Sequence, residues 1–323
     1  MPVRASVLAR RPRRLGALAV LVAAGLGTAP KAARAAEDAT PARDSTAAAA
    51  PAQRRVEWSP DWPRFRLWEY GGTAVIGGLS IYLYRYVSPP EQPRWYGTNA
   101  FDDTFRDWLR ADSRAGRESA GSLGNILSWG GAAVPFVIDL PVIWFVHRQP
   151  GVAWQVLMMD LEAEAVSGFI KNLLFAEAGR ARPSFRDCAA DPNYDALCGA
   201  AANNASFPSG HTVNIATAAG LVCVHHHYLP IYGQAAADAG VCALLSAATV
   251  VTAVTRSISD RHYTTDSMVG AVLGFGAGYG LPWLLHYRAG AAAPAGAATG
   301  TTRPVLLPIA SGSGLGLGLL WAM

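Results

Sequence analysis

Six apolar segments, each close to the length that an α-helix needs to cross a bilayer, occupy the chain between residues 70 and 287. Hydrophobic residues make up 51% of the chain and charged residues only 15%, a balance that favours a membrane protein. The pattern predicts an all-α, membrane-associated bundle of about six apolar helices. The segments run over residues 70–87, 123–147, 152–175, 211–230, 238–256 and 267–287.

Polar residues interrupt several of these segments, and ionisable groups at membrane depth are costly unless they face a bundle interior or water. We therefore expect the interrupting side chains to point inward: Asp139, Asp160, Glu162, Glu164 and Asn214. Trp and Tyr gather at the segment ends, as they do in interfacial belts. Small residues in the last segment predict close helix packing: Gly270, Gly274, Gly276, Gly278 and Gly280.

The N-terminal part of the chain differs in composition from the apolar segments. Residues 1–36 combine a cluster of four arginines (Arg10, Arg11, Arg13 and Arg14), a short apolar stretch and the small-x-small pattern Ala33-Arg34-Ala35, which together predict a cleaved export signal. An uncleaved N-terminal anchor is the alternative. Residues 37–69 predict a disordered linker, because their first part is rich in Ala, Pro and Thr.

One helical domain is predicted over residues 70–288, with its core at 120–287. A polar connector, 88–122, carries Phe101, Phe105, Trp108 and Leu109 at helical spacing, which predicts either an amphipathic helix at an interface or an ordinary surface helix. Residues 289–323 predict a low-complexity tail, in which the Leu-Gly alternation allows a short strand or hairpin.

The chemistry-bearing residues lie at the borders of the apolar segments. Ser209-Gly210-His211 opens one segment, Arg256 closes the next, and His262 and Asp266 precede the last. Because His262 and Asp266 are four residues apart, on a helix they would share a face, and the carboxylate could accept from the imidazole. Such a contact fixes the tautomer and leaves the other ring nitrogen free to attack.

Three motifs together resemble the signature of the type 2 phosphatidic acid phosphatase and vanadium haloperoxidase superfamily, over roughly residues 120–287. Pro208-Ser209-Gly210-His211 matches its second part, and Thr255-Arg256 with His262 and Asp266 matches the third, with Thr in place of the usual Ser. Arg182-Pro183 matches the end of the first part.

The first motif departs at its lysine, because the position seven before Arg182 is Phe175 and the nearest lysine is Lys171. On a helix Lys171 would face the same way as Phe175, roughly one turn (~5.4 Å) further from Arg182. It would then either reach the site or serve only as a counter-ion in its own helix. Arg180 is a second candidate for the missing charge.

The resemblance implies a metal-free, two-step hydrolysis of a phosphate ester that needs no cofactor. His262 would be the nucleophile, Asp266 would orient it, and His211 would act as general acid and then general base. The anion cradle would comprise the guanidinium groups and backbone N–H groups at a helix start, contributed by Arg182, Ser209, Gly210 and Arg256, with Lys171 or Arg180 added.

The apolar bundle favours a phospholipid or polyprenyl phosphate as substrate, such as phosphatidate, undecaprenyl pyrophosphate or a lipid A phosphate. Two alternatives remain open. The same cradle could hold vanadate in a haloperoxidase, or the displaced lysine could mark a degenerate, non-catalytic lipid-binding protein. The net charge of +4 and the scattered arginines do not indicate a nucleic-acid partner.

Cysteines and histidines outside the motifs raise further expectations. In an exported protein Cys188 and Cys198 predict a local disulfide, whereas Cys223 and Cys242 lie in apolar segments and predict core packing. Three successive histidines, 225–227, point about 100° apart on a helix, so they are not expected to bind one metal ion.

The expected location is a bacterial cell membrane with the site facing the periplasm. If all six segments crossed and the signal were removed, the first site loop would fall on the cytoplasmic side, where the Cys188–Cys198 pair would not be favoured. A segment 70–87 that does not span would resolve this conflict.

Overall fold

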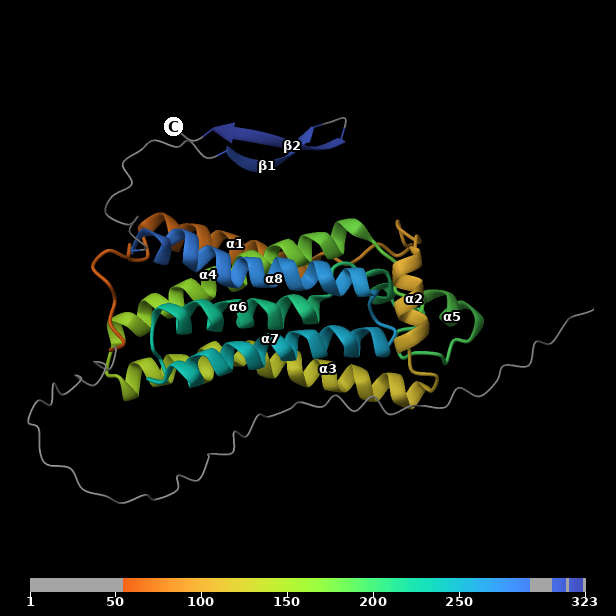
Figure 1. Cartoon of the computed structure of the whole chain (residues 1–323). Helices are drawn as coiled ribbons and strands as arrows, with labels where there is room; N and C mark the ends of the chain where they lie inside the picture. The colour runs from red at the N-terminus through yellow and green to blue at the C-terminus, as the bar shows by residue number, and fades with distance from the viewer. Residues whose placement is uncertain (1–54, 291–303, 312–313, 322–323) are drawn as a thin grey trace, which may run out of the picture. The chain divides into compact units, whose positions relative to one another are not determined.

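The computed structural model describes residues 55–290, 304–311 and 314–321 (Figure 1). The predictions for residues 1–36 and for the first part of the linker lie outside the described residues. Within the described part, six long helices form a bundle: α1 (Leu67–Tyr86), α3 (Arg114–Val134), α4 (Pro150–Ala178), α6 (Gly210–Tyr228), α7 (Ala235–Ile258) and α8 (Thr264–Leu285). The expectation of an all-α bundle is confirmed.

Shorter elements connect the long helices. Two π-helical turns, η1 (Pro135–Asp139) and η2 (Val142–Val146), continue α3, and α2 (Ala100–Leu109) and α5 (Phe185–Ala190) lie at one end of the bundle (Figure 1). Two 3₁₀ turns, η3 (Ala201–Asn204) and η4 (Tyr287–Gly290), precede α6 and follow α8. In the tail, β1 (Pro304–Ser311) pairs antiparallel with β2 (Gly314–Trp321), with Pro304 opposite Trp321, so the predicted hairpin forms.

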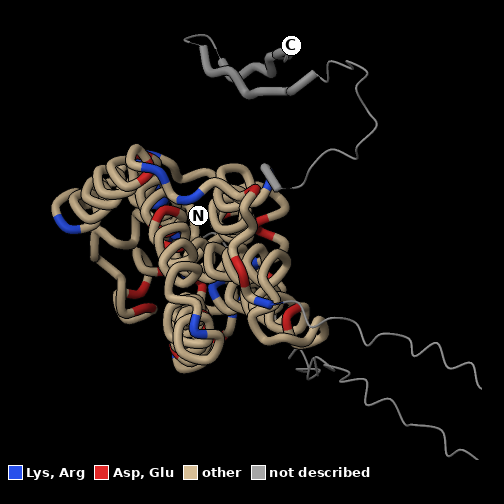
Figure 2. The backbone as a smooth tube through the Cα atoms, turned by 90° about the vertical axis from the view of Figure 1, so that its left-hand side faces the viewer, with Lys and Arg blue, Asp and Glu red and all other residues tan. Residues whose placement is uncertain are grey.

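Helix α6 is the centre of the bundle. It packs against α3, α4, α7 and α8, and from Ile215 to His226 every residue is buried. Its sequence explains this position, because small and apolar residues cover the whole circumference and a helix of that kind is stable only when it is enclosed. Figure 2 views the helices of the bundle nearly end-on.

Glycines of α8 allow its backbone to lie directly on α6. A Cβ on Gly274 would lie 2.3 Å from the carbonyl oxygen of Val213, and one on Gly278 would lie 2.1 Å from that of Thr217. Gly270 makes the same kind of contact with Ser209. The predicted close packing is therefore confirmed at these three glycines, whereas Gly276 and Gly280 face open space.

The segment just before α1 is packed, so the prediction of a disordered linker over 37–69 is wrong for residues 55–69. Val56 and Phe65 belong to the hydrophobic core, and Trp58 and Trp62 pack against it. The two tryptophans contact each other edge-on, and Trp62 also contacts Tyr287 edge-on. The low complexity of the preceding residues concealed this aromatic anchor.

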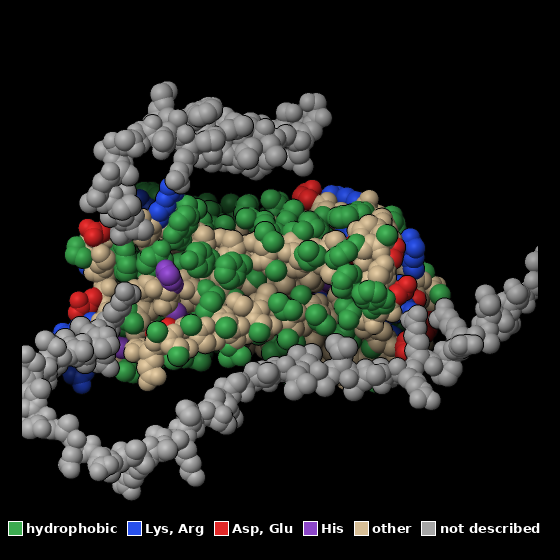
Figure 3. Space-filling model, viewed as in Figure 1, with side chains coloured by type: hydrophobic (Ala, Val, Ile, Leu, Met, Phe, Trp, Pro, Cys, Tyr) green, Lys and Arg blue, Asp and Glu red, His purple; other side chains and the backbone are tan. Residues whose placement is uncertain are grey.

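Three of the helical stretches in the described part of the chain are long and apolar enough to cross a membrane: Arg114–Val146, α7 and α8. Fewer than six of the apolar segments therefore qualify as membrane spans by length and composition. Buried ionisable residues lower the apolar character of α4, which contains Asp160, Glu162 and Lys171. Hydrophobic side chains nevertheless cover the length of the bundle, and charged ones gather at its two ends (Figure 3).

The helix ends that carry the three sequence motifs meet at one end of the bundle. Helix α4 ends there at Gly179, whose φ of 54° is a left-handed cap, so the chain turns away before Arg182. Helix α6 begins at this end, and α7 ends where α8 begins. Figure 1 shows α2 running across this end.

Candidate active site

The start of α6 forms one wall of the site. Ser209 is the N-cap and Gly210 the first helical residue, so the first backbone N–H groups of the helix have no intrahelical acceptors. A Cβ on Gly210 would lie 2.9 Å from the Phe175 ring and 3.3 Å from the Lys171 side chain. Glycine is therefore required here for α4 and α6 to approach, and the exposed N–H groups suit an anion.

His262 lies in the turn between α7 and α8 and is 3% exposed. Its Nδ1 lies 2.6 Å from the backbone carbonyl oxygen of Ser206. Because a carbonyl only accepts, Nδ1 carries the proton and Nε2 keeps its lone pair. Burial, together with the nearby guanidinium groups of Arg182 and Arg256, lowers the pKa of His262 well below its usual value. The ring is thus a neutral imidazole with a free nitrogen.

Asp266 does not contact His262 directly, so the contact expected from their i, i+4 spacing is wrong. Helix α8 begins only at Thr264, and therefore the two residues do not lie on one helical face. Asp266 accepts instead from the Ser206 hydroxyl at 2.6 Å and from the backbone N–H of Tyr263 at 3.0 Å. Since Ser206 is the residue whose carbonyl holds His262, the carboxylate supports the ring through Ser206.

Arg180 is not a phosphate ligand in this arrangement, which corrects that expectation. It is 1% exposed, donates to Asp266, and donates to Asp102 of α2 at 2.8 Å. Its guanidinium lies between the rings of Trp95 and Tyr263, each 4.2 Å away. Two carboxylates and two aromatic rings contact the Arg180 guanidinium, which therefore connects α2 to the start of α8.

Three other guanidinium groups remain incompletely satisfied near His262. Arg182 donates from Nε to the carbonyl of Ala202 at 2.9 Å, but its Nη1 is buried without an acceptor among the described residues. Arg256 donates to Asn125 at 3.2 Å, and its Nε is buried without a partner in the described part. The Nε of Arg261 is likewise buried without a hydrogen-bond partner among the described residues.

These cations lie close enough to act on one another and on both histidines. The charges of Arg182 and Arg256 disfavour the protonated form of His262. The charges of the same two arginines, with those of Lys171 and Arg261, disfavour the protonated form of His211. Buried like charges with unsatisfied N–H groups are unfavourable unless an anion joins them. The arrangement therefore fits a tetrahedral oxyanion such as phosphate.

A family comparison agrees with this geometry. Residues 153–289 match the model of the PAP2 superfamily. Over these residues the chain is similar to the PAP2 superfamily. The match covers the loops and helices that carry Arg182, His211 and His262, and it supports a phosphatase or phosphoesterase activity. The comparison with curated proteins gave no match, and neither did the comparison with solved structures.

Lys171 lies on α4 one turn before Phe175. Its Nζ donates to the side-chain oxygen of Asn214 on α6 at 3.1 Å, and its stem packs against Gly210. The predicted common face of Lys171 and Phe175 is confirmed by their shared contact with Gly210. Phe175 occupies the position of the usual lysine and fills it with an apolar ring.

Arg261 is a residue that reasoning from the motifs missed. It lies beside His262 in sequence, and its Nη2 pairs with Asp195 at 3.2 Å. The signal that could have found it is its place inside the third motif, where a second arginine directly precedes the histidine. The turn that carries it is held by Asp260, which accepts from Arg106 of α2 at 2.7 and 2.8 Å.

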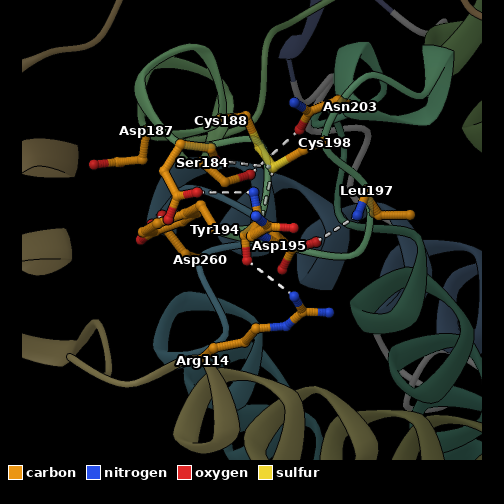
Figure 4. Close-up of a disulfide and its surroundings, with 12 residues drawn as sticks. Arg114, Ser184, Asp187, Cys188, Tyr194, Asp195, Leu197, Cys198, Asn203 and Asp260 are labelled. Atoms are coloured by element: carbon orange, nitrogen blue, oxygen red, sulfur yellow. Dashed lines mark hydrogen bonds between the residues drawn. A yellow bond between two sulfur atoms is a disulfide. The ribbon is translucent and has the colours of Figure 1, made fainter.

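The loop between Arg182 and Ser209 is cross-linked, as predicted, by a disulfide between Cys188 and Cys198 (Figure 4). Tyr194, within the closed loop, donates to Asp260 at 2.9 Å, which connects the loop to the turn before His262. The second pair, Cys223 and Cys242, also forms a disulfide, between α6 and α7, so the expectation that these two are only core residues is wrong.

The histidine run 225–227 does not converge on one point, as expected from helical geometry. His225 contacts Asp160 at 3.0 Å and Tyr287 at 2.8 Å. His226 turns to a different carboxylate, Asp238, at 2.6 Å, and His227 is exposed. The run lies at the end of α6 opposite to the PAP2 motifs.

Proposed function

We propose that this protein hydrolyses a phosphate ester of a lipid through a phosphohistidine intermediate. The observation that carries the proposal is the set of buried, unsatisfied guanidinium N–H groups of Arg182, Arg256 and Arg261. Arg182 and Arg256 lie near His262, whose Nε2 is free, and all three arginines lie near His211. A bound phosphoryl group would satisfy these donors and place phosphorus next to a nucleophile. With three guanidinium groups and Lys171, the cradle neutralises phosphate without requiring a metal.

In the first step, Nε2 of His262 attacks phosphorus, and the bond from phosphorus to the ester oxygen breaks with its electron pair on that oxygen. His211 donates a proton to the leaving alkoxide. An imidazolium at His211 would be repelled by the surrounding cations, so the anionic substrate is what makes its protonated form accessible. In the second step His211 takes a proton from water, water attacks phosphorus, and the P–N bond returns its pair to Nε2.

Asp266 is a positioning residue in this scheme. It holds Ser206 by its hydroxyl, and the carbonyl of Ser206 holds the N–H edge of the nucleophile. When the phosphohistidine forms, positive charge develops on the ring, and both the carbonyl and the carboxylate beyond it stabilise that charge.

A lipid substrate is supported by an apolar groove beside the site. Helices α2, α7 and α8 line it with Phe105, Leu109, Val250, Val254, Met268 and Ala271. Ser257 and Thr264 line the inner end of the groove and also the small pocket that contains His262. A lipid whose acyl chain lay in the groove would place its phosphate headgroup next to His262, at this end of the bundle.

We place the site on the extracytoplasmic side of a bacterial cell membrane. The Cys188–Cys198 disulfide beside the site supports an oxidising compartment, in which such cross-links persist. The belt of exposed apolar side chains supports the membrane location.

The decisive experiment measures phosphate release by the full chain in detergent, with long-chain phosphatidate and with the soluble ester p-nitrophenyl phosphate. We expect His262→Ala to lower kcat by at least about 10³-fold for both substrates, since it removes the nucleophile. Acid quenching during turnover of ³²P-labelled substrate should trap an acid-labile phosphoprotein in the wild type only. Equal phosphate release by the wild type and the variant would refute the proposal.

A second arm tests the groove. Ala271→Trp would fill it, so KM should rise for phosphatidate and stay unchanged for p-nitrophenyl phosphate. An equal effect on both substrates would show that the groove does not hold the lipid chain.

A further inference from the structure

A second buried cluster lies at the end of the bundle opposite to the PAP2 motifs. It joins Glu69 in the first turn of α1, Glu162 on α4, and His286 directly after α8. Each of the three offers one ligand atom, and these atoms lie within 4.8 Å of one another. Glu69 and His286 are fully buried, and Glu162 is 8% exposed.

Two atoms of the cluster are buried without a hydrogen-bond partner in the described part of the chain: Oε2 of Glu162 and Nε2 of His286. Nδ1 of His286 lies 2.9 Å from the carbonyl oxygen of Pro63, so Nδ1 carries the proton and the lone pair of Nε2 points into the cluster. An unpartnered carboxylate oxygen and an unpartnered imidazole lone pair are both electron-pair donors. Without a proton between them neither can satisfy the other, and a cation that accepts an electron pair from each would complete the cluster.

We propose that Glu69, Glu162 and His286 bind a divalent transition-metal cation. Two carboxylates and one neutral imidazole suit Zn²⁺ or Mn²⁺ better than Mg²⁺ or Ca²⁺, which take oxygen ligands. Two ligands of one tetrahedral Zn²⁺ at ~2.1 Å are roughly 3.4 Å apart. The Nε2 of His286 and the Oε1 of Glu69 already lie 3.6 Å apart.

The surroundings of the cluster resemble the outer shell of a metal site. Ligand histidines commonly donate their second N–H to a carbonyl, as His286 does to Pro63, and ligand carboxylates commonly accept further hydrogen bonds. Arg66 donates to Oε2 of Glu69 through its backbone N–H and its Nε, and to Oε1 through Nη2 at 2.7 Å, which leaves one lone pair free on Oε1. Phe65 stacks on the His286 ring and limits access of water.

The cation would fasten three elements that are far apart in sequence. Glu69 lies outside the matched region 153–289, whereas Glu162 and His286 lie within it. The site would therefore attach α1 and the aromatic anchor before it to the PAP2 region.

The test uses the full-length chain, free of affinity tag, in detergent and stripped with a chelator. After incubation with ZnCl₂ or, separately, MnCl₂ and desalting, elemental analysis should find about one cation per chain. Glu162→Gln and His286→Asn should each weaken binding at least 10-fold. His227→Ala, which removes an exposed histidine at the same end of the bundle, should bind as the wild type does.

X-ray absorption at the zinc edge tests the ligand set in the unaltered protein. We expect one imidazole nitrogen with oxygen neighbours and no sulfur. The cation should also raise the thermal midpoint of the wild type but not that of Glu162→Gln. No bound cation with either metal, the same binding in Glu162→Gln as in the wild type, or loss of binding in His227→Ala would each overturn the proposal.

Discussion

At the scale of single residues, His262, the proposed nucleophile, is held by a series of contacts, here called the relay, that begins outside the matched region. Asp102 of α2 accepts from Arg180 at 2.8 Å, Arg180 donates to Asp266, and Asp266 holds Ser206, whose carbonyl positions His262. Every side chain in the relay is buried, so no water replaces a lost contact easily. The orientation of the ring thus depends on a residue far from it in sequence.

We predict that Asp102→Asn lowers kcat by about 10- to 100-fold and leaves KM nearly unchanged. The change weakens the hold on Arg180 and displaces Asp266 and Ser206, whereas the phosphate cradle is untouched. Steady-state kinetics on p-nitrophenyl phosphate checks the split between kcat and KM. Asp103→Asn is the matched control, because Asp103 is the exposed neighbour on the same helix. A proportionate rise in KM, or equal losses in both variants, would argue against positioning through Arg180.

Some contacts of the site could be predicted from the sequence, and others could not. The resemblance implied a cradle that contains Arg182 and Arg256, and the structure brings the charges of both close to His262, because these residues lie at helix ends that meet. The i, i+4 rule failed for His262 and Asp266, since a helix begins between them. Arg180 was misassigned because its partner, Asp102, lies on another helix and nothing in local sequence connects the two. The Cys223–Cys242 bond was missed for the same reason.

At the scale of elements, the contact of α8 with α6 sets the position of the site, because His211 lies in the first turn of α6 and His262 lies two residues before α8. The contact depends on the absence of a side chain at the glycines that meet α6. A Cβ on Gly274 would also lie 2.8 Å from the Cβ of Ala216 and 2.9 Å from the backbone nitrogen of Thr217. None of these neighbours is the end of a flexible side chain, so the helices themselves would have to separate.

We predict that Gly274→Ala destabilises the protein by roughly 1–3 kcal/mol, as overpacking of a tight contact does. Gly276→Ala, two residues away with nothing within 4 Å, should instead be neutral or stabilising by about 0.5–1 kcal/mol, because alanine favours a helix. Thermal unfolding in detergent, followed by circular dichroism, compares the two. Similar midpoints for the two variants would show that α8 does not rest on α6 through this glycine.

At the scale of the whole molecule, an apolar side surface and charged ends indicate a bundle that sits in a bilayer. Val272 of α8 is 74% exposed and Val250 of α7 is 63% exposed, which is costly in water but favourable in lipid. The number of apolar segments could be read from the sequence. Which of them form the outer surface could not, because α6 is as apolar as its neighbours and yet is enclosed.

We predict that Val272→Arg strongly reduces the amount of protein found in the membrane fraction. In a bilayer an arginine near the middle of a helix costs about 2.5–3.5 kcal/mol on insertion scales. At an exposed position in water the same change would stay within about 0.5 kcal/mol. Leu67→Arg is the matched control, because Leu67 is 91% exposed and opens α1 at an end of the bundle, where an arginine can reach water. Quantitative blotting of membrane and soluble fractions should therefore show loss of the first variant and normal levels of the second. If both variants accumulate in the membrane like the wild type, the apolar surface does not face lipid chains. Only a hydrocarbon environment penalises an arginine at Val272 and not at Leu67, although both positions are exposed.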